Sequence, residues 1–370
     1  MKIRVLEVLA TLKRAGAERV AVSLARGLDG ARFECGLVSL YDAFSDGFEP
    51  ALAERGIAVW HLGKRRGFDP RMWPRLIRVL REFRPDVVHS HSYILRYTFP
   101  AALAARTRVM VHSVHNLAVN DVDAFGRLVN RAAFRCGVLS VAVSTAVTRT
   151  FRVTYGFDPA ATIPNGIDVD RFYRPGARRE WRRAHGFVGD DILIASVARL
   201  EPQKDPLGMI GAFAQALAGD ARCHLLMAGE GSLREAAGEC AERCGVAGRV
   251  HFLGVCADVP ELLSSSDLFA LASRWEGGPL VVIEAMAAGL PVAATAVGGI
   301  NELTEPGLTA ILVPPGDTGA LAGALASLVS DPERRRVMGE AARRRAARFG
   351  VEAMVASYGE LFERALKERR

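Results

Sequence analysis

Short apolar, strand-like runs alternate with helical stretches along nearly the whole chain. This alternation is typical of α/β domains built on parallel sheets. The strand-like runs lie at residues 2–9, 33–40, 57–61, 85–90, 109–115, 139–144 and 161–163, and then at 192–197, 223–228, 250–253, 268–272, 292–295 and 311–313. The pattern predicts an α/β chain with two Rossmann-like halves.

The length of 370 residues is too great for one ordinary domain and predicts two. A polar, basic and irregular stretch at 168–183 is the expected linker. The tail is predicted to form two helices separated near Gly350. We therefore expect an N-terminal domain over 1–168 and a C-terminal domain over 169–350, facing each other across a cleft. A final helix at about 351–370 is expected to pack back on the first domain.

Charge is distributed unevenly over the two halves. Residues 1–165 contain 24 Lys and Arg against 14 Asp and Glu, whereas the remainder contains 24 against 27. The basic half is either a set of solvated arginines or a face for an anionic partner, such as a membrane surface or a phosphorylated acceptor. No nucleic-acid-binding motif accompanies the charge, so nucleic acid is the least favoured partner.

The six cysteines form no C-x-x-C pair and are expected to be dispersed, buried thiols in a reducing compartment. The first twelve residues are too short and polar for a signal peptide and are predicted to form a strand. No run of 18 apolar residues is present. These features predict a cytoplasmic protein, with peripheral contact at the inner membrane face left open.

The segment from Glu276 to Glu284 predicts a ligand site at the start of a helix. Gly277, Gly278 and Pro279 suit a turn and the first helical position, and an apolar helix follows. Glu284 would lie roughly 8 Å into that helix at ~1.5 Å per residue. Free amides at a helix N-terminus favour a phosphate, and a deeper carboxylate can accept hydrogen bonds from two neighbouring hydroxyls. The segment thus predicts a sugar-nucleotide site.

Arg199 and Lys204 are the second candidate pair. Arg199 lies at the carboxyl end of a predicted strand, where open α/β sheets bind ligands. Lys204 precedes a helix predicted to have Asp205 as N-cap and Pro206 at its first position. One Arg and one Lys with helix-terminal amides can neutralise a diphosphate without a metal. The alternative is a surface ion pair of these cations with Glu201 or Asp205.

Two glycine-containing loops follow predicted strands. Gly229 and Gly231 resemble the opening of a dinucleotide fingerprint, but Arg234 occupies the place of the third glycine. Nicotinamide binding is therefore disfavoured, and a tight turn beside a phosphate or ribose is expected. Gly16 belongs to a small-residue loop whose backbone can approach a ligand closely.

Histidines and aspartates of the first half supply further candidates. His115 lies just past a strand end, where it is expected to face the cleft. His89 and His91 alternate along another strand end; a metal pair there lacks a third ligand, so acceptor contact by His91 is the better hypothesis. The two D-x-D triplets, 121–123 and 168–170, lie in a loop and in the linker and are expected not to bind metal.

Taken in order, these segments closely resemble the retaining, metal-independent glycosyltransferases of GT-B fold, specifically family 4. The resemblance covers nearly the whole chain. Its segments are residues 15–18, His115, Ser144, 165–168, Arg199 with Lys204, 229–231, 252–254, and Glu276 with Glu284, the last being the family's E-x7-E signature.

The resemblance implies roles for individual residues. Arg199 and Lys204 would hold the donor diphosphate, and Glu284 the ribose hydroxyls. Glu276 would contact the donor sugar, and His115 would touch that sugar near its 6-position. The implied donor-binding set is Gly16, Arg199, Lys204, Gly231, Leu253 (whose backbone would read the base), Glu276, Gly277, Gly278, Pro279, Leu280 and Glu284. The implied catalytic set is His115, Glu276, Arg199 and Lys204, and the acceptor side is Arg14, His91 and Asn165.

The implied reaction moves a hexose from a nucleoside-diphosphate sugar to a hydroxyl of a saccharide or lipid-linked acceptor, in glycan or cell-envelope biosynthesis. A UDP-sugar is favoured over a GDP-sugar, and no metal or cofactor is expected. In the family the configuration is retained without a protein nucleophile, and the departing phosphate takes the acceptor's proton. The alternatives are a non-catalytic sugar-nucleotide-binding partner subunit, an epimerase or a phosphorylase.

Three positions depart from the family pattern. Ala15 stands where many members carry the first glycine of a pair, Ala198 replaces a common glycine, and Asp205 stands where a glycine often follows the lysine. All three changes are small or compatible with loops, so activity is still expected.

Overall fold

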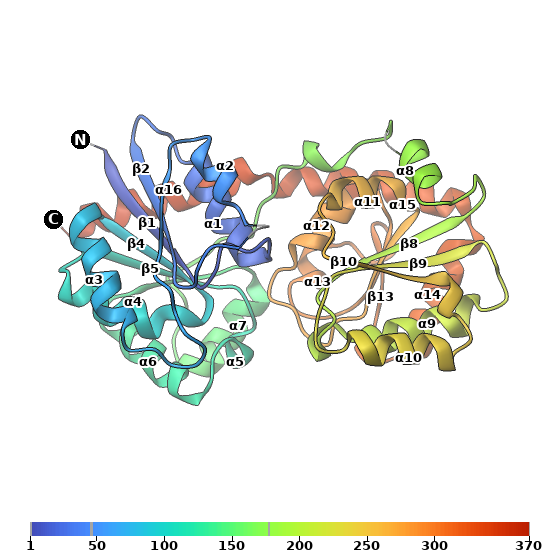
Figure 1. Cartoon of the computed structure of the whole chain (residues 1–370), viewed down its shortest axis with the longest axis horizontal. Helices are drawn as coiled ribbons and strands as arrows, with labels where there is room; N and C mark the ends of the chain where they lie inside the picture. The colour runs from blue at the N-terminus through green and yellow to red at the C-terminus, as the bar shows by residue number, and fades with distance from the viewer. Residues whose placement is uncertain (1, 45–46, 177, 370) are drawn as a thin grey trace. The chain divides into compact units, whose positions relative to one another are not determined.

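The computed structural model describes residues 2–44, 47–176 and 178–369. The chain forms two compact units (Figure 1). The first comprises Met1–Gly166 with Val351–Arg370, and the second comprises Ile167–Gly350. The division after Gly166 lies two residues before the boundary expected from the sequence.

A seven-stranded sheet in the order β3-β2-β1-β4-β5-β6-β7 forms the first unit, and its paired strands all run parallel. Its strands are β1 Ile3–Leu9, β2 Phe33–Ser39, β3 Ala58–His61, β4 Val87–His91, β5 Val109–Val114, β6 Leu139–Ala142 and β7 Ala161–Thr162. Its helices are α1 Gly16–Gly27, α2 Glu49–Ala53, α3 Met72–Phe83, α4 Leu95–Ala104, α5 Ala118–Asp121, α6 Ala124–Arg135, α7 Thr145–Tyr155 and α16 Val351–Glu368. Most of these strands coincide with the predicted runs.

The C-terminal helix α16 is part of the first unit, as the sequence predicted. Tyr358 is buried, and its hydroxyl lies 2.7 Å from Ser113 Oγ on β5. Near the surface, Arg32 donates to Glu363 at 3.0 Å. The helix therefore contributes both a buried polar contact and apolar surface to the core of a sheet formed by residues far away in sequence.

A six-stranded parallel sheet in the order β10-β9-β8-β11-β12-β13 forms the second unit. Its strands are β8 Ile192–Val197, β9 Cys223–Ala228, β10 Val250–Gly254, β11 Leu268–Leu271, β12 Val292–Thr295 and β13 Ala310–Val313. Its helices are α8 Arg178–Ala184, α9 Pro206–Leu217, α10 Arg234–Arg243, α11 Val259–Ser265, α12 Leu280–Ala287, α13 Ile300–Leu303, α14 Thr318–Ser330 and α15 Pro332–Ala346.

The expected linker at 168–183 instead belongs to the second unit, and its described residues include folded elements. It contains a 3-10 helix, Asp170–Phe172, and most of α8. Trp181 packs in a buried cluster, while Arg182 donates to the Ser265 carbonyl at 2.9 Å and pairs with Asp267 at 2.5 Å. The expectation was wrong because the basic residues that made the segment look solvated have partners on a distant part of the chain.

The cysteines correct a second expectation. Only Cys223 is fully buried, whereas Cys136 and Cys244 are exposed, and all six thiols are free. Among the described residues, no helix is long and apolar enough to cross a membrane.

Candidate functional site

The candidate residues of the second unit gather at the carboxyl ends of its strands. Arg199 follows β8, and Glu276 follows β11, its neighbour in the sheet. Strand order reverses between these two strands, because β9 and β10 lie on one side of β8 and β11 to β13 on the other. Ligands of open α/β sheets bind at such a switch point. The two predicted residues therefore flank the position where this fold leaves room for a ligand.

Lys204 and Glu276 form a buried ion pair beside this switch point. Lys204 Nζ donates to Glu276 Oε1, and Ser273 Oγ donates to the same oxygen at 2.6 Å. The side chains are 15% and 5% exposed, respectively. The pair thus holds an ammonium group in a fixed position at the strand ends.

Lys204 does not take the alternative pairing with Glu201 or Asp205, although the charge of Arg199 contributes to lowering the pKa of Glu201 after its hydrogen bonds from Ser232. Glu201 accepts hydrogen bonds from the backbone N and the hydroxyl of Ser232, at 3.0 and 2.7 Å. Asp205 pairs with Arg274 at 3.4 Å. The sequence suggested these neighbours because they are close along the chain, but the partner of Lys204 comes from the loop after β11.

Asp205 caps the helix that follows Lys204. Its carboxylate accepts from Gly208 N at 3.2 Å, and Pro206 opens α9, so the predicted cap is confirmed. Asp205 has φ +47°, in the left-handed region where glycine is favoured. This conformation accounts for a glycine being common here, while aspartate both tolerates it and supplies a cap. Ala15, by contrast, has φ −121°, which any residue adopts.

The Gly229 and Gly231 loop lies directly against the backbone that carries Arg199. A Cβ on Gly229 would lie 2.0 Å from the Ala198 carbonyl oxygen, and one on Gly231 would lie 2.3 Å from that of Leu200. These glycines are therefore required for close backbone packing, and they fix the course of the Arg199 loop.

A second glycine pair supports the Glu276 loop, and the sequence reasoning missed it. A Cβ on Gly298 would lie 1.7 Å from the Glu276 carbonyl oxygen, and one on Gly299 would lie 2.3 Å from that of Gly277. Thr295 Oγ1 also donates to the Ser273 carbonyl at 2.5 Å. The signal available in the sequence was a Gly-Gly pair soon after the predicted strand at 292–295.

Helix α12 begins one residue later than expected. Pro279 is its N-cap and Leu280 its first residue, because Pro279 has an extended ψ of 111°. Glu284 is 2% exposed and lies just over one turn into the helix. Gly277 and Gly278 precede the cap, and Leu253 lies near the end of edge strand β10.

The candidate residues of the first unit lie at the carboxyl edge of its own sheet. Arg14 is in the loop after β1, and Gly16 begins α1. His91 ends β4, and His115 immediately follows β5. Asn165 follows β7 and is buried. This edge therefore brings together residues separated by 150 positions.

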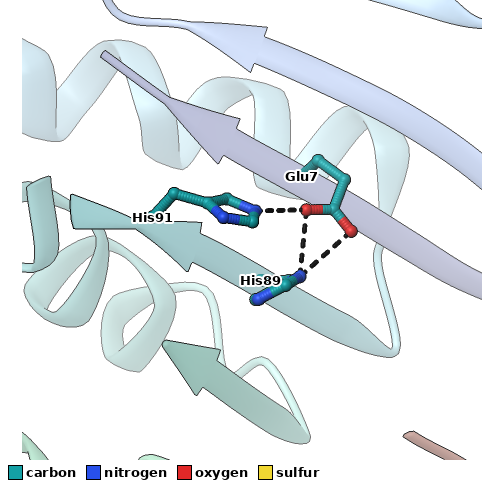
Figure 2. A group of neighbouring side chains, drawn as sticks. All are labelled: Glu7, His89 and His91. Carbon is teal, nitrogen blue, oxygen red and sulfur yellow. Dashed lines mark hydrogen bonds and ion pairs between the residues drawn. The ribbon is translucent and has the colours of Figure 1, made fainter. Parts of the chain in front are cut away.

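Glu7 on β1 joins His89 and His91 on β4 in a fully buried cluster, shown in Figure 2. Both rings point toward the Glu7 carboxylate. Glu7 Oε2 lies 3.0 Å from His89 Nδ1 and 2.7 Å from His91 Nε2. The sequence reasoning found no third group near the histidine pair, and Glu7 supplies one. Glu7 is directly opposite His89 in the β1–β4 register, a pairing that only the sheet topology reveals.

The electrostatics of the cluster keep Glu7 ionised. Burial alone would raise the pKa of Glu7, but the charge of His89 and the hydrogen bonds from both histidines lower it to about 2. Burial, together with the charge of His89, lowers the pKa of His91 to about 4. Burial, and then its neighbours His91 and His89, hold the pKa of His115 well below its usual range. His91 and His115 are thus neutral at pH 7.

The first D-x-D triplet serves the local structure. Asp123 caps α6 by accepting from Gly126 N at 2.6 Å and pairs with Arg96 at 2.8 Å. Burial raises the pKa of Asp121 to about 7. Asp170, from the second triplet, opens the 3-10 helix before α8.

Two family models match adjoining parts of the chain. The model described as Glycosyltransferase Family 4 matches residues 14–171, and the model described as Glycosyl transferases group 1 matches residues 177–345. The matches correspond closely to the two units.

Curated relatives carry glycosyltransferase names. D-inositol 3-phosphate glycosyltransferase 2 of Catenulispora acidiphila is 29% identical over 77% of this chain and 72% of its own length. D-inositol 3-phosphate glycosyltransferase of Mycobacterium tuberculosis is 33% identical over 74% of this chain and 61% of its own length. The putative glycosyltransferase EpsD of Bacillus subtilis is 31% identical over 55% of each. The chain therefore spans less than two thirds of the length of several of these relatives.

Two solved structures share the fold along nearly the whole chain. HepE of Anabaena, in complex with UDP and glucose, has a TM-score of 0.86 at 23% identity and covers 98% of this chain and 99% of its own. WaaG, a glycosyltransferase involved in lipopolysaccharide biosynthesis, has a TM-score of 0.76 at 18% identity and covers 97% and 99%.

Proposed function

The chain belongs to the family 4 glycosyltransferases and has their GT-B fold, and from this we propose that it transfers a hexose from a nucleoside-diphosphate sugar to an acceptor hydroxyl. We infer retention of configuration and no requirement for a metal or cofactor. The observation that carries the proposal is the positioned ammonium of Lys204 at the switch point of the second sheet, on the same β8–α9 connection as Arg199. A diphosphate entering there would meet two cations and the N-terminus of α12.

Support for a UDP-sugar comes from HepE, whose structures hold UDP and UDP-glucose. In this proposal Glu284 binds the ribose, and Glu276 contacts the sugar. The departing phosphate takes the acceptor's proton, so that catalysis rests on positioning and charge stabilisation. The acceptor is a saccharide or a lipid-linked intermediate; the inositol phosphate relatives add a phosphorylated polyol to the acceptors worth screening.

Isothermal titration with UDP and GDP tests the donor site. We expect Lys204→Ala to abolish nucleotide binding, because it removes the fixed ammonium group. Arg222→Ala is the matched control, since Arg222 is exposed and immediately precedes β9. It therefore lies at the amino ends of the strands, whereas Lys204 lies at their carboxyl ends. Unchanged affinity in Lys204→Ala would overturn the assignment.

Turnover of the donor separates an enzyme from a binding subunit. Purified protein is expected to release UDP from a UDP-hexose in the presence of a suitable acceptor. Failure across a broad screen of donors and acceptors, with nucleotide binding intact, would favour the partner-subunit alternative. Conversion of the donor without any acceptor would indicate an epimerase, and dependence on inorganic phosphate a phosphorylase.

We also propose peripheral contact of helix α6 with an anionic membrane at the cytoplasmic face. Phe125 and Leu128 on α6 are 58% and 65% exposed, and Arg127, Arg131 and Arg135 are exposed on the same helix. Exposed apolar side chains beside cations suit the headgroup region of an anionic bilayer. Flotation with phosphatidylglycerol vesicles should recover the protein, and the Phe125→Ser, Leu128→Ser double variant should not float. Equal flotation of both proteins would contradict this proposal.

A further inference from the structure

A continuous line of hydrogen bonds joins Glu7 to His115 within the first unit. Glu7 Oε2 lies 2.7 Å from His91 Nε2. On the other side of the same ring, His91 Nδ1 lies 2.9 Å from His115 Nε2. The His91 and His115 rings are also stacked, with centroids 5.2 Å apart and planes inclined by 24°. His115 is thus held both by a hydrogen bond and by packing.

The proton positions along this line follow from what each group can donate. An ionised carboxylate only accepts, so the proton between Glu7 and His91 is on His91 Nε2. A neutral imidazole has one N–H, so His91 Nδ1 is bare and must accept. The donor that it faces is His115 Nε2–H. The single N–H of His115 therefore donates to His91, and Nδ1 of His115 keeps an unshared lone pair.

The other arm of the cluster holds the Glu7 carboxylate and runs through His89 to helix α16. His89 Nδ1 donates to Glu7 Oε1 at 3.1 Å, and His89 Nε2 lies 2.8 Å from Ser113 Oγ. Ser113 Oγ in turn lies 2.7 Å from the Tyr358 hydroxyl on α16.

The separations within the cluster are those of hydrogen bonds. Zinc bonds to nitrogen and oxygen of about 2.0–2.2 Å at tetrahedral angles would place ligand atoms about 3.3 Å apart. The two Glu7–histidine separations are shorter, at 2.7 and 3.0 Å. The separations therefore suit protons shared between these groups.

We infer that Glu7 and His91 are positioning residues that fix His115 as the Nε2–H tautomer, so that its Nδ1 accepts a hydrogen bond from a hydroxyl of the donor sugar. This rests on the proposed function and on the role that the family resemblance implies for His115, contact with the donor sugar near its 6-position. The unprotonated Nδ1 of His115 accepts a hydrogen bond from a 6-hydroxyl. A 6-deoxy sugar has no hydroxyl at that position, and the nitrogen lone pair repels the carboxylate of a uronic acid. The hydrogen-bonded line from Glu7 through His91 to His115 therefore selects hexoses with a free 6-hydroxyl over 6-deoxyhexoses and uronic acids.

The tautomer is measured directly in the full chain by long-range ¹H–¹⁵N correlation on ¹⁵N-histidine-labelled protein. His115→Gln identifies the signals of His115. We expect a protonated Nε2 and an unprotonated Nδ1 in the unsubstituted protein at pH 7. A protonated Nδ1 would overturn the inference without any variant being needed. Zinc binding with a stoichiometry of one, lost in Glu7→Gln, would overturn it as well, because the nitrogens would then be ligands.

Variants of His91 and Tyr358 test whether the hydrogen bond from His115 to His91 fixes the tautomer of His115. His91→Phe retains the stacked ring but removes its acceptor nitrogen, so His115 should become a mixture of both tautomers. Tyr358→Phe changes only the His89 arm and should leave His115 as a single tautomer. The preference in kcat/KM for a UDP-hexose over its 6-deoxy analogue should fall at least tenfold in His91→Phe and stay unchanged in Tyr358→Phe. A preference unchanged in both variants would refute the selection.

The two proposals fail in different ways. The tautomer measurement requires no turnover. An inactive protein with the expected His115 tautomer would count against the transferase activity and leave the inference about the His115 tautomer standing. An active transferase with protonated His115 Nδ1 would overturn that inference alone.

Discussion

Replacing Lys204 should lower the free energy of unfolding by more than replacing its ion-pair partner Glu276. Lys204→Met leaves the Glu276 carboxylate buried, while the Ser273 hydroxyl still donates to it. An uncompensated buried charge of this kind costs roughly 3–5 kcal/mol, and the Ser273 hydrogen bond places this case near 3. Glu276→Gln leaves an ammonium group whose side chain is 15% exposed and can be hydrated, so about 1 kcal/mol is expected.

The double variant gives the coupling between the two residues. In the Glu276→Gln background, Lys204→Met should cost less than about 1 kcal/mol, so the coupling free energy is about 2 kcal/mol. Urea unfolding monitored on the transition of the second unit measures all four proteins, because two units need not unfold together. UDP should raise the melting temperature of Glu276→Gln but not that of Lys204→Met. Equal costs of Lys204→Met in both backgrounds would show that no buried charge is being neutralised.

Three further predictions concern single positions. Glu284→Ala should weaken nucleotide binding in calorimetry, whereas Glu276→Ala should mainly lower kcat; equal losses of affinity would contradict this division. Asp205→Ala should lower thermal stability by about 2 kcal/mol, from the lost cap and the left-handed backbone, while Asp205→Asn should cost only a few tenths. Burial lowers the pKa of His112 to about 3, so on acidification the unfolded chain protonates His112 before the folded chain does, and the free energy of unfolding should fall as pH drops from 6.5 toward 3. His112→Asn should flatten this decline in melting experiments run across that pH range. An unchanged pH dependence in the variant would exclude His112 as the source of the decline.

Local patterns predicted what local interactions determine. The strand runs and the Asp205 cap follow from residues within a few positions of one another, and the structure contains both. The interpretation of 168–183 as a linker failed because two partners of Arg182, the Ser265 carbonyl and the Asp267 carboxylate, lie more than 80 positions away.

Long-range pairing also explains the site features that were missed. Glu7 is a charged residue in a largely apolar strand, and its role depends on the register of β1 against β4. Likewise, the Lys204–Glu276 pair joins loops 72 positions apart. Such contacts are set by the order of strands in the sheet, which alternation alone does not specify.

The inclusion of α16 in the first sheet's core has a consequence for the order of folding. The second unit is one continuous segment, residues 167–350, and can complete its core as soon as that segment has left the ribosome. The first unit, although synthesised earlier, lacks Tyr358 and the apolar face of α16 until residues 351–370 are made. Domains usually fold in the order of synthesis; here the earlier unit is expected to finish last, and the Glu7–histidine cluster beneath Tyr358 stays open to water until it does.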